Sequence, residues 1–383
     1  MPDPLDQTRQ CVFCGLCLPH CPTYALHEDE AESPRGRIAL MQALQEARLT
    51  ADDPALARHL DRCLGCGRCE AMCPSRVPYL SLLDTARNMQ QQARPRRLPH
   101  AARALLQATR TPARLRLAAA GTRLLRRLPG HPRLLDVLSR RDRVVPERRP
   151  ETEEPVWLFA DCMSGLLEDE RLPAARTLLQ ALGHAVRLPS GPSCCGALHQ
   201  HAGLPQAAAD WQRRNARAYG TSGPVLSLAS GCARQLATDP ELGPRHQAIT
   251  AFVAEHPHLD RLRFRPLEAS VLVHTPCTDP NGEAATALLA RIPGLNVRPL
   301  PMAHGCCGAG GLNLITEPEQ GAALRAPLLD AVRESGATWL VSSNIGCALH
   351  LADGLREADI PCTVLHPLVL LARQLEPANP TAC

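Results

Sequence analysis

Eight cysteines near the amino terminus have the spacing of iron–sulfur ligands. They form two runs of the pattern C-x2-C-x2-C-x3-C-P, which end at Pro22 and Pro74. In such a run a tight loop brings three thiolates to one [4Fe–4S] cluster, and the fourth cysteine ligates the other cluster. We therefore assign one cluster to Cys11, Cys14, Cys17 and Cys73, and the other to Cys63, Cys66, Cys69 and Cys21.

A pair of zinc knuckles is the alternative for these cysteines. Zinc sites usually show two separated CxxC pairs, whereas each run here holds four cysteines within eleven residues. The spacing therefore favours iron–sulfur clusters over zinc.

Eight further cysteines follow a duplicated pattern. The first copy holds Cys162, Cys194, Cys195 and Cys232, and the second holds Cys277, Cys306, Cys307 and Cys347. The offsets between corresponding positions are 115, 112 and 115 residues, which indicates an internal duplication. We expect a metal or redox site in each copy, because structural cysteines more often point into a core from the middle of a strand.

Short apolar runs alternate with helical patterns after Pro150, which predicts parallel α/β organisation. The expected strands are residues 155–160, 185–189, 224–230, 270–275, 297–301 and 338–343, and the expected helices include 172–182 and 283–291. The cysteines then follow the carboxyl ends of strands, where parallel sheets bind ligands.

The segment between the two cysteine runs begins a helix. Ser33 is the predicted N-cap, and Pro34 suits the first turn. Because four thiolates leave an oxidised cluster negatively charged, Arg35 and Arg37 could neutralise it and raise its potential. A solvated helix start is an equally open interpretation.

Composition narrows the class of protein. The chain of 383 residues holds 18 cysteines but no lysine, which excludes Schiff-base and P-loop chemistry. It shows neither a secretory signal nor an apolar stretch long enough to span a membrane. We therefore expect a cytoplasmic, reducing location, in which cysteines point to metal sites or catalysis. A net charge of +4 and 3% aromatic residues argue against a nucleic-acid partner.

Residues 94–149 carry 16 arginines against 3 acidic residues. Leucine and alanine at helical spacing predict one or two amphipathic helices, interrupted at Pro99, Pro112, Pro129 and Pro132. Such a segment could dock on an acidic partner or on anionic lipid, or it could be a solvated connector.

Several polar residues stand near the duplicated cysteines. They are His199, His201, His274, His304 and, beside Cys162, Asp161. The histidines could relay protons or donate hydrogen bonds to cluster sulfurs, although loop histidines are more often ordinary polar residues. The sequence leaves the role of Asp161 open. We interpret Cys362 and Cys383, outside both copies, as structural.

The chain resembles the iron–sulfur subunit of glycolate oxidase (glycolate dehydrogenase), and more distantly the anaerobic glycerol-3-phosphate dehydrogenase C subunit and heterodisulfide reductase subunits. The segments that carry the resemblance are CVFCGLCLPHCPTY, SPRGRI, HLDRCLGCGRCEAMCPS, CCGALHQHAG, ASGCARQ, HTPCT, CCGAGG and SSNIGCALHLA. The resemblance implies an α+β multidomain fold. Its expected parts are a helical two-cluster ferredoxin-like domain (1–85), an Arg-rich helical connector (86–150) and two α/β cysteine-rich CCG units (151–268 and 269–383).

The resemblance implies an electron-transfer subunit of an oxidoreductase complex, without catalytic residues of its own. A partner FAD-binding dehydrogenase subunit would oxidise glycolate, and this chain would pass the electrons to a quinone or another acceptor. The complex could lie peripherally at the inner face of the cell membrane. We expect no flavin in this chain, because no G-x-G-x-x-G follows a strand. The same role in a D-lactate or glycerol-3-phosphate dehydrogenase complex is the alternative, and a non-catalytic metal-binding module is a third, less favoured one.

One departure concerns the CCG units. In heterodisulfide reductase each unit ends in CxxC and offers five cysteines, whereas here the endings are C-A-R-Q and C-A-L-H. Each unit therefore offers four thiolates, which suit one cubane, and His350 could also reach a metal. We expect an additional cluster in one or both units and do not carry over disulfide reduction.

Overall fold

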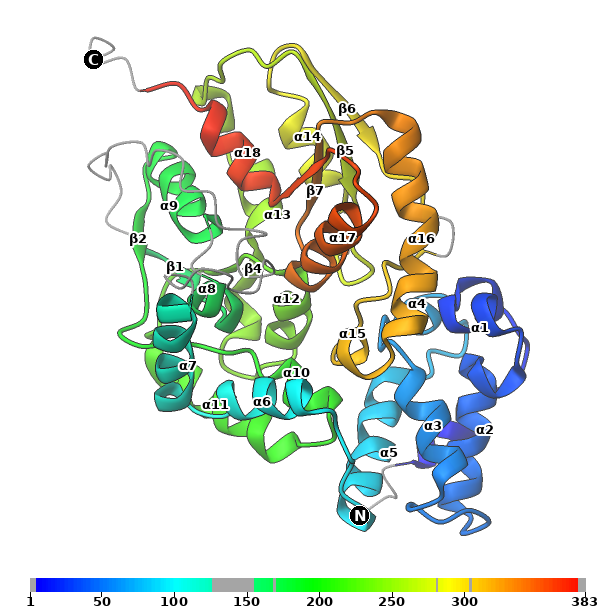
Figure 1. Cartoon of the computed structure of the whole chain (residues 1–383). Coiled ribbons are helices and arrows are strands. Elements are labelled where there is room, and N and C mark those ends of the chain that lie inside the picture. Colours follow the sequence, from blue (N-terminus) through cyan, green and yellow to red (C-terminus); the bar gives the residue numbers. More distant parts are fainter. Residues whose placement is uncertain (1–4, 126–154, 168–169, 280–281, 303–304, 378–383) are drawn as a thin grey trace. The chain divides into compact units, whose positions relative to one another are not determined.

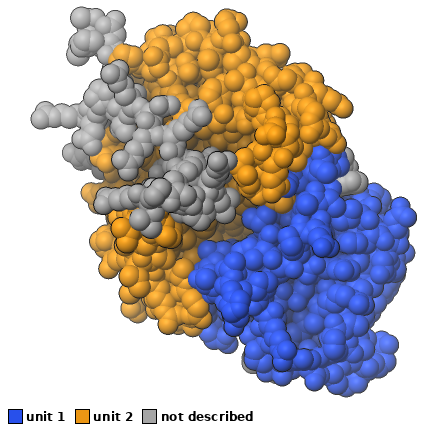
Figure 2. Space-filling model, in the orientation of Figure 1, with its two compact units in different colours: residues 1–106, 196–209, 302–328 blue, residues 107–195, 210–301, 329–383 orange. Residues whose placement is uncertain are grey.

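The computed structural model describes residues 5–125, 155–167, 170–279, 282–302 and 305–377. The chain forms two compact units, which Figure 2 shows in different colours. The N-terminal unit comprises residues 1–106, 196–209 and 302–328, and the sheet unit comprises residues 107–195, 210–301 and 329–383. The segments that follow the two Cys-Cys pairs thus belong to the same unit as the ferredoxin-like runs. The four ranges expected from the sequence follow the motifs, whereas each compact unit combines parts of several of these ranges.

The N-terminal unit is built from short helices (Figure 1). Its 3-10 helices are η1 (Asp6–Gln10), η2 (Leu18–His20) and η3 (Glu30–Glu32). Its α-helices are α1 (Pro22–His27), α2 (Pro34–Gln45), α3 (Pro54–Arg62), α4 (Arg68–Ala71), α5 (Tyr79–Ala93), α10 (Ala197–His201) and α15 (Asn313–Thr316). Helices α6 (His100–Ala108), α11 (Pro205–Ala218) and α16 (Pro318–Ser335) have residues in both units.

Helix α2 begins as its sequence predicts. The Ser33 hydroxyl accepts a hydrogen bond from the Gly36 N–H at 2.9 Å, and proline occupies the first turn. Ile38, Met41 and Leu44 lie on one face of the helix and are buried in the core of this unit. The cap and this apolar face place the start of α2 beside the cysteine loops.

The sheet unit alternates strands with helices. Its strands are β1 (Pro155–Phe159), β2 (Ala185–Arg187), β3 (Val225–Ser227), β4 (His246–Ala248), β5 (Ala269–His274), β6 (Leu295–Pro299), β7 (Trp339–Ser342) and β8 (Thr363–Leu365). Its helices are α7 (Pro112–Leu125), α8 (Cys162–Leu167), α9 (Arg171–Ala181), α12 (Ser230–Ala237), η5 (Gly243–Arg245), α13 (Ile249–Ala254), η6 (Leu259–Arg261), α14 (Gly282–Leu289), α17 (Ile345–Glu357) and α18 (Pro367–Gln374).

The described strands form two parallel four-stranded sheets of the same topology. Their orders are β2-β1-β3-β4 and β6-β5-β7-β8. In each sheet the second strand in sequence pairs with one side of the first strand, and the third strand pairs with its other side. The carboxyl ends of β1 and β3, and of β5 and β7, therefore flank the point at which parallel sheets usually bind ligands. This arrangement agrees with the duplication expected from the cysteine spacing.

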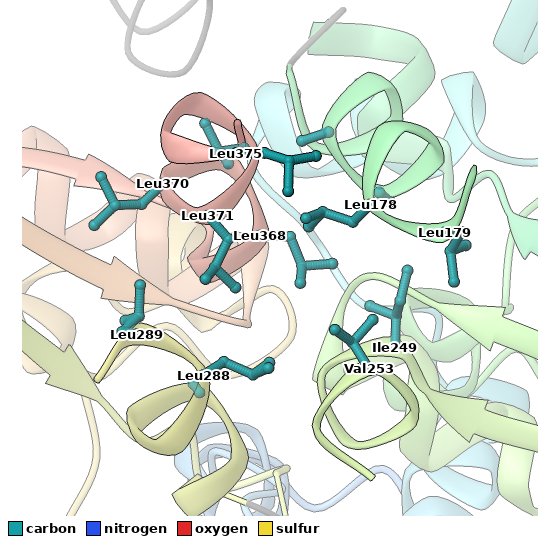
Figure 3. Close-up of a cluster of buried hydrophobic side chains, with 14 of the residues drawn as sticks. Leu178, Leu179, Ile249, Val253, Leu288, Leu289, Leu368, Leu370, Leu371 and Leu375 are labelled. Carbon is teal, nitrogen blue, oxygen red and sulfur yellow. The ribbon is translucent and has the colours of Figure 1, made fainter. Parts of the chain in front are cut away.

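One apolar core serves both sheets. Helices α9, α13, α14 and α18 contribute leucine, isoleucine and valine side chains that face one another (Figure 3). Leu178, Leu289, Leu368 and Leu371 are at most 1% exposed. Burial of this kind contributes about 25 cal/mol per Å² of apolar surface. It holds the strand ends, and with them the cysteines, in a fixed arrangement.

The α/β organisation is confirmed, and the main differences from the sequence prediction lie in short strands. The sequence pattern does not predict β4 and β8, because β4 (His-Gln-Ala) carries no apolar run and β8 (Thr-Val-Leu) only two apolar residues. The run 224–230 was predicted as one strand, but β3 ends at Ser227 and α12 begins at Ser230. In the Arg-rich segment, α6 and α7 begin just after Pro99 and at Pro112, whereas residues 126–154 lie outside the described residues.

Candidate metal centres

One cavity in the N-terminal unit is lined by four cysteines from both runs. They are Cys11, Cys14, Cys17 and Cys73, and Cys69 reaches the same lining. Phe13 and Gly15 have positive φ angles of 55° and 82°, which turn the loop tightly around the sulfurs. Cys14 is exposed and the other three are half-buried. We name this the outer cavity.

A second cavity in the same unit is lined by the remaining four cysteines of the two runs. They are Cys21, Cys63, Cys66 and Cys69. Three of them are buried and Cys66 is half-buried. Gly65 and Gly67, with φ angles of 59° and 73°, turn the loop between them. We name this the inner cavity.

The donor sets of both cavities fit [4Fe–4S] clusters. One cubane takes four protein ligands. The inner cavity presents four thiols, and the outer cavity presents four besides Cys69, which lines both; in each set of four, three sulfurs come from one run and the fourth from the other. No competing donor is needed, so the residues present suffice for two clusters.

The charged groups beside the outer cavity are partly exposed to solvent. Burial raises the pKa of the Cys11 and Cys17 thiols above the ordinary value. The cation that lines this cavity is Arg35, whose Nε donates to Glu30 Oε1 at 2.7 Å. This hydrogen bond lowers the pKa of Glu30. Because half of the Glu30 side chain is exposed, solvent screens the pair.

Buried cations surround the inner cavity. The Arg37 side chain is fully buried, and its Nη1 donates to Thr23 Oγ1 at 2.9 Å. Arg87 donates from Nη2 to the carbonyl oxygen of Cys63 at 2.8 Å. Burial by itself would raise the pKa of the Cys63 thiol, but both guanidinium groups and the Tyr79 hydroxyl outweigh it and lower that pKa. Burial and the neighbouring thiols raise the pKa of Cys69, so the cations favour negative charge at Cys63 in particular.

Glu32 binds Arg37 beside the inner cavity, a role that no sequence pattern predicts. Its carboxylate pairs with Arg37, accepts from Arg62 Nη1 at 3.2 Å and hydrogen-bonds His59 Nδ1 at 2.9 Å. Glu32 is 0% exposed. The partners lie up to thirty residues away, so only the folded chain could reveal the network.

The two segments that follow the Cys-Cys pairs contact the Cys63–Cys69 loop within the N-terminal unit. Arg68 Nη1 donates to the carbonyl oxygen of Gly305 at 2.9 Å, one residue before Cys306. A Cβ atom at Gly310 would lie 2.4 Å from the carbonyl oxygen of Leu64, so only glycine fits there. His201 forms a 3.4 Å contact with Asp84 on α5. Cys306 and Cys307 are buried in this unit.

The four thiols of the first duplicated copy lie together in the sheet unit. Cys162 follows β1, Cys194 and Cys195 follow β2, and Cys232 lies in the first turn of α12 after β3. All four are buried. Hydrogen bonding with the Cys162 and Cys195 thiols, followed by burial, raises the pKa of Cys194. The Cys195 thiol likewise raises the pKa of Cys232. Cys194 thus contacts Cys162 and Cys195, and Cys195 contacts Cys232, so the four sulfurs form one connected group that could supply donors to a metal centre.

In the second copy, Cys277 follows β5 and Cys347 lies in the first turn of α17. Both belong to the sheet unit, as does His274 at the end of β5. Burial lowers the pKa of His274 to about 4, so its imidazole is neutral at physiological pH. His350 is buried on α17.

The remaining sequence candidates have varied surroundings. Asp161 accepts hydrogen bonds from the N–H groups of Met163 and Ser164 at 3.0 and 2.9 Å, so its role is to cap α8. His199 is buried on α10. Burial raises the pKa of Cys362 to about 12. His304 and Cys383 lie outside the described residues.

Comparison with known proteins defines the class of this chain. The profile of the 4Fe-4S dicluster domain matches residues 7–77, and that of the Cysteine-rich domain matches residues 156–237 and 271–352. The chain is thus an iron–sulfur protein that joins a dicluster domain to a duplicated cysteine-rich domain. Within the described residues, no helix combines the length and apolar character needed to cross a membrane.

Curated relatives identify the family. The glycolate oxidase iron-sulfur subunit of Escherichia coli (strain K12) is 30% identical over 96% of this chain and 94% of its own length. The probable glycolate oxidase iron-sulfur subunit of Bacillus subtilis (strain 168) is 28% identical over 90% and 88%. The chain therefore belongs to the family of glycolate oxidase iron–sulfur subunits.

Two further similarities are more partial. Lactate utilization protein A of Geobacillus kaustophilus (strain HTA426) is 27% identical over 55% of this chain and 95% of its own length. The crystal structure of a hypothetical protein from Helicobacter pylori has a TM-score of 0.50, 12% identity and coverage of 91% of this chain and 68% of that chain. At this identity the second similarity concerns the fold alone.

Proposed function

We propose that this chain is the electron-transfer subunit of a flavin-dependent glycolate oxidase complex. Its partner would be an FAD-binding subunit that oxidises glycolate, and a quinone or another acceptor would take the electrons from this chain. The observation that carries the proposal is the pair of cavities, each lined by four cysteines drawn from both runs. Family membership supports the same assignment.

Two [4Fe–4S] clusters are the proposed cofactors. The outer cavity would hold one through Cys11, Cys14, Cys17 and Cys73, and the inner cavity the other through Cys21, Cys63, Cys66 and Cys69. Such clusters supply one-electron transfer when bound. The chain's own residues provide the thiolates, shield three sulfurs of the inner cavity from water and place Arg37 and Arg87 beside them.

The division between subunits follows from the chemistry of the substrate. Oxidation of a 2-hydroxy acid to the 2-oxo acid releases two electrons and two protons, in the form of a hydride and a proton, and a hydride acceptor such as a flavin takes the electron pair. This proposal therefore gives substrate binding and oxidation to the partner and gives electron relay to this chain.

The duplicated cysteines are proposed to hold an additional cluster in one or both copies. The four buried thiols of the first copy, linked in sequence by contacts between neighbouring sulfurs, support this proposal. The Arg-rich segment of residues 94–149 is proposed to contact an acidic partner or the inner face of the cell membrane.

The decisive experiment isolates the complex anaerobically through a tag on this chain. Two clusters give about eight irons and eight acid-labile sulfides per chain, and more than eight would implicate the duplicated copies. Electron paramagnetic resonance (EPR) signals of reduced clusters should appear with dithionite and also with glycolate. Stoichiometric zinc without a paramagnetic signal would refute the cluster assignment, and clusters that glycolate does not reduce would refute the substrate.

One observation favours a second substrate as the electron donor. The match to lactate utilization protein A covers 55% of this chain, so the partner could instead oxidise lactate. Titration of the isolated complex with D-lactate, L-lactate and glycolate in parallel distinguishes these donors, because only the true donor reduces the clusters at a catalytically competent rate.

A further inference from the structure

His274 occupies a ligand-binding position in the second sheet. It is the last residue of β5 and pairs in register with Ser342, the last residue of β7. The carboxyl ends of these adjacent strands flank the point where the strand order reverses, which is where parallel sheets usually bind ligands. The side chain is only 2% exposed, so water does not satisfy its nitrogens.

The two nitrogens of this imidazole differ. Nδ1 hydrogen-bonds the Ser342 hydroxyl at 3.0 Å. Nε2 has no hydrogen-bond partner among the residues that the structure describes. With the proton on Nδ1 and donated to the serine, Nε2 presents an unused lone pair. A buried polar atom without a partner is costly and rare in native proteins, so Nε2 is expected to bind something.

A thiol stands next to this imidazole. A ring nitrogen of His274 and the Sγ atom of Cys347 lie within 4.8 Å of one another. Cys347 is buried in the first turn of α17, where Asn344 Oδ1 accepts its N–H at 3.2 Å and fixes the backbone. Both donors are therefore held by hydrogen bonds to neighbouring residues, as metal ligands usually are.

The first copy has no counterpart of this nitrogen. The offset of 115 residues that relates Cys162 to Cys277 places Phe159 at the position of His274. Phe159 stacks on Tyr219 with ring centroids 5.4 Å apart, a packing role. The thiols of the first copy contact one another instead. The duplicated copies therefore differ in donor type at the same place in the sheet.

We propose that the second copy binds iron through mixed nitrogen and sulfur ligands, with His274 Nε2 and the Cys347 thiolate as two of them. This inference rests on the proposed cluster in the duplicated copies and names its ligands. By the duplication, Cys277, which belongs to the same unit, is the sequence candidate for a further ligand. Imidazole in place of thiolate removes a negative charge, and such replacement raises the reduction potential of an iron–sulfur centre. The second centre thus accepts an electron more readily than an all-thiolate one.

The test compares His274→Ala and His274→Cys with His246→Ala in the anaerobically isolated full chain. His246 is a matched control, because its Nε2 hydrogen-bonds Ser227 at 2.9 Å and Ser227 stands at the position of Ser342 in the first copy. Pulsed EPR with ¹⁵N-histidine labelling should detect a directly bound nitrogen in the unmodified chain and in His246→Ala. His274→Ala should lose that coupling and up to about four irons per chain, whereas His274→Cys should keep the iron without the coupling.

Two results overturn the inference and leave the proposed function intact. They are a nitrogen coupling that persists in His274→Ala, or a chain with the two N-terminal clusters in which His274→Ala changes neither iron content nor spectrum. The signals of the N-terminal clusters report folding of each variant. A chain without iron at all would instead overturn the proposed function together with this inference.

Discussion

The two cysteine-lined cavities of the N-terminal unit have the same donor set and opposite surroundings. The outer cavity opens to solvent at Cys14, and its arginine is tied to the half-exposed Glu30. Three of the four cysteines of the inner cavity are buried, Arg37 is buried against the carboxylate of Glu32, and the buried Arg87 donates to the carbonyl oxygen of Cys63. The two cavities thus offer cysteine ligands of the same kind but suit different roles in electron transfer. The exposed site suits exchange of electrons with a partner, and the buried cationic site suits their retention.

Loss of one ligand should have the largest effect, and the two cavities should respond differently. Cys63→Ser and Cys14→Ser should each lower the iron content by about four atoms per chain. Only Cys63→Ser should also lower the thermal midpoint strongly, since it leaves buried guanidinium groups without thiolate partners. Iron analysis and calorimetry measure both. Equal midpoints for the two variants would contradict the difference in surroundings.

The buried ion pair should be the next most sensitive feature. Arg37→Met leaves Glu32 with a fully buried and poorly compensated charge, which costs about 3–5 kcal/mol of unfolding free energy. Arg35→Met is the matched control in the same helix turn and should leave the unfolding midpoint nearly unchanged, because its partner is exposed. Denaturant titration of the cluster-loaded chain measures both. The double variant Arg37→Met/Glu32→Gln should recover part of the loss.

Arg87 should set a reduction potential without affecting the other site. It donates to the carbonyl oxygens of Leu60 and Cys63, so Arg87→Gln removes a cation without isolating a buried acid. A loss of about 1–2 kcal/mol of favourable charge interaction corresponds to roughly 40–90 mV for one electron. Redox titration followed by EPR should show one of the two N-terminal signals shifted downward. Equal shifts in the potentials of both signals would show that Arg87 does not act on the inner cavity alone.

The smallest effect should arise at the exposed apolar side chains of the outer loop. Val12 and Leu16 are 69% and 57% exposed beside the cysteines, although apolar side chains this close together are usually covered by a partner. Leu16→Asp should slow reduction of the complex by its substrate about three- to tenfold, equivalent to about 1 kcal/mol of docking free energy. Leu188→Asp, at a position 41% exposed after β2 and outside the Arg-rich segment, is the control. Similar rates for the two variants would exclude this loop as the docking point.

The sequence by itself determined the features that depend on short spacing. Two-residue gaps between cysteines predicted tight loops, Ser33 and Pro34 predicted the start of α2, and offsets of 115 and 112 residues predicted two sheets of one topology. These signals are local or periodic, because chain geometry over a few residues fixes them. The three residues of β4 and of β8 carry no such local signal, so these strands were recognised only in the structure.

Only the tertiary structure decided how two similar donor sets came to differ. Arg35 and Arg37 are two residues apart, and the sequence left both with the same role. In the fold one arginine lies at the surface and the other is buried against Glu32, which also binds Arg62. The free Nε2 atom of His274 likewise emerged only from packing. Dielectric surroundings and charge balance arise from segments that meet across long stretches of chain, and no local pattern of residues encodes them.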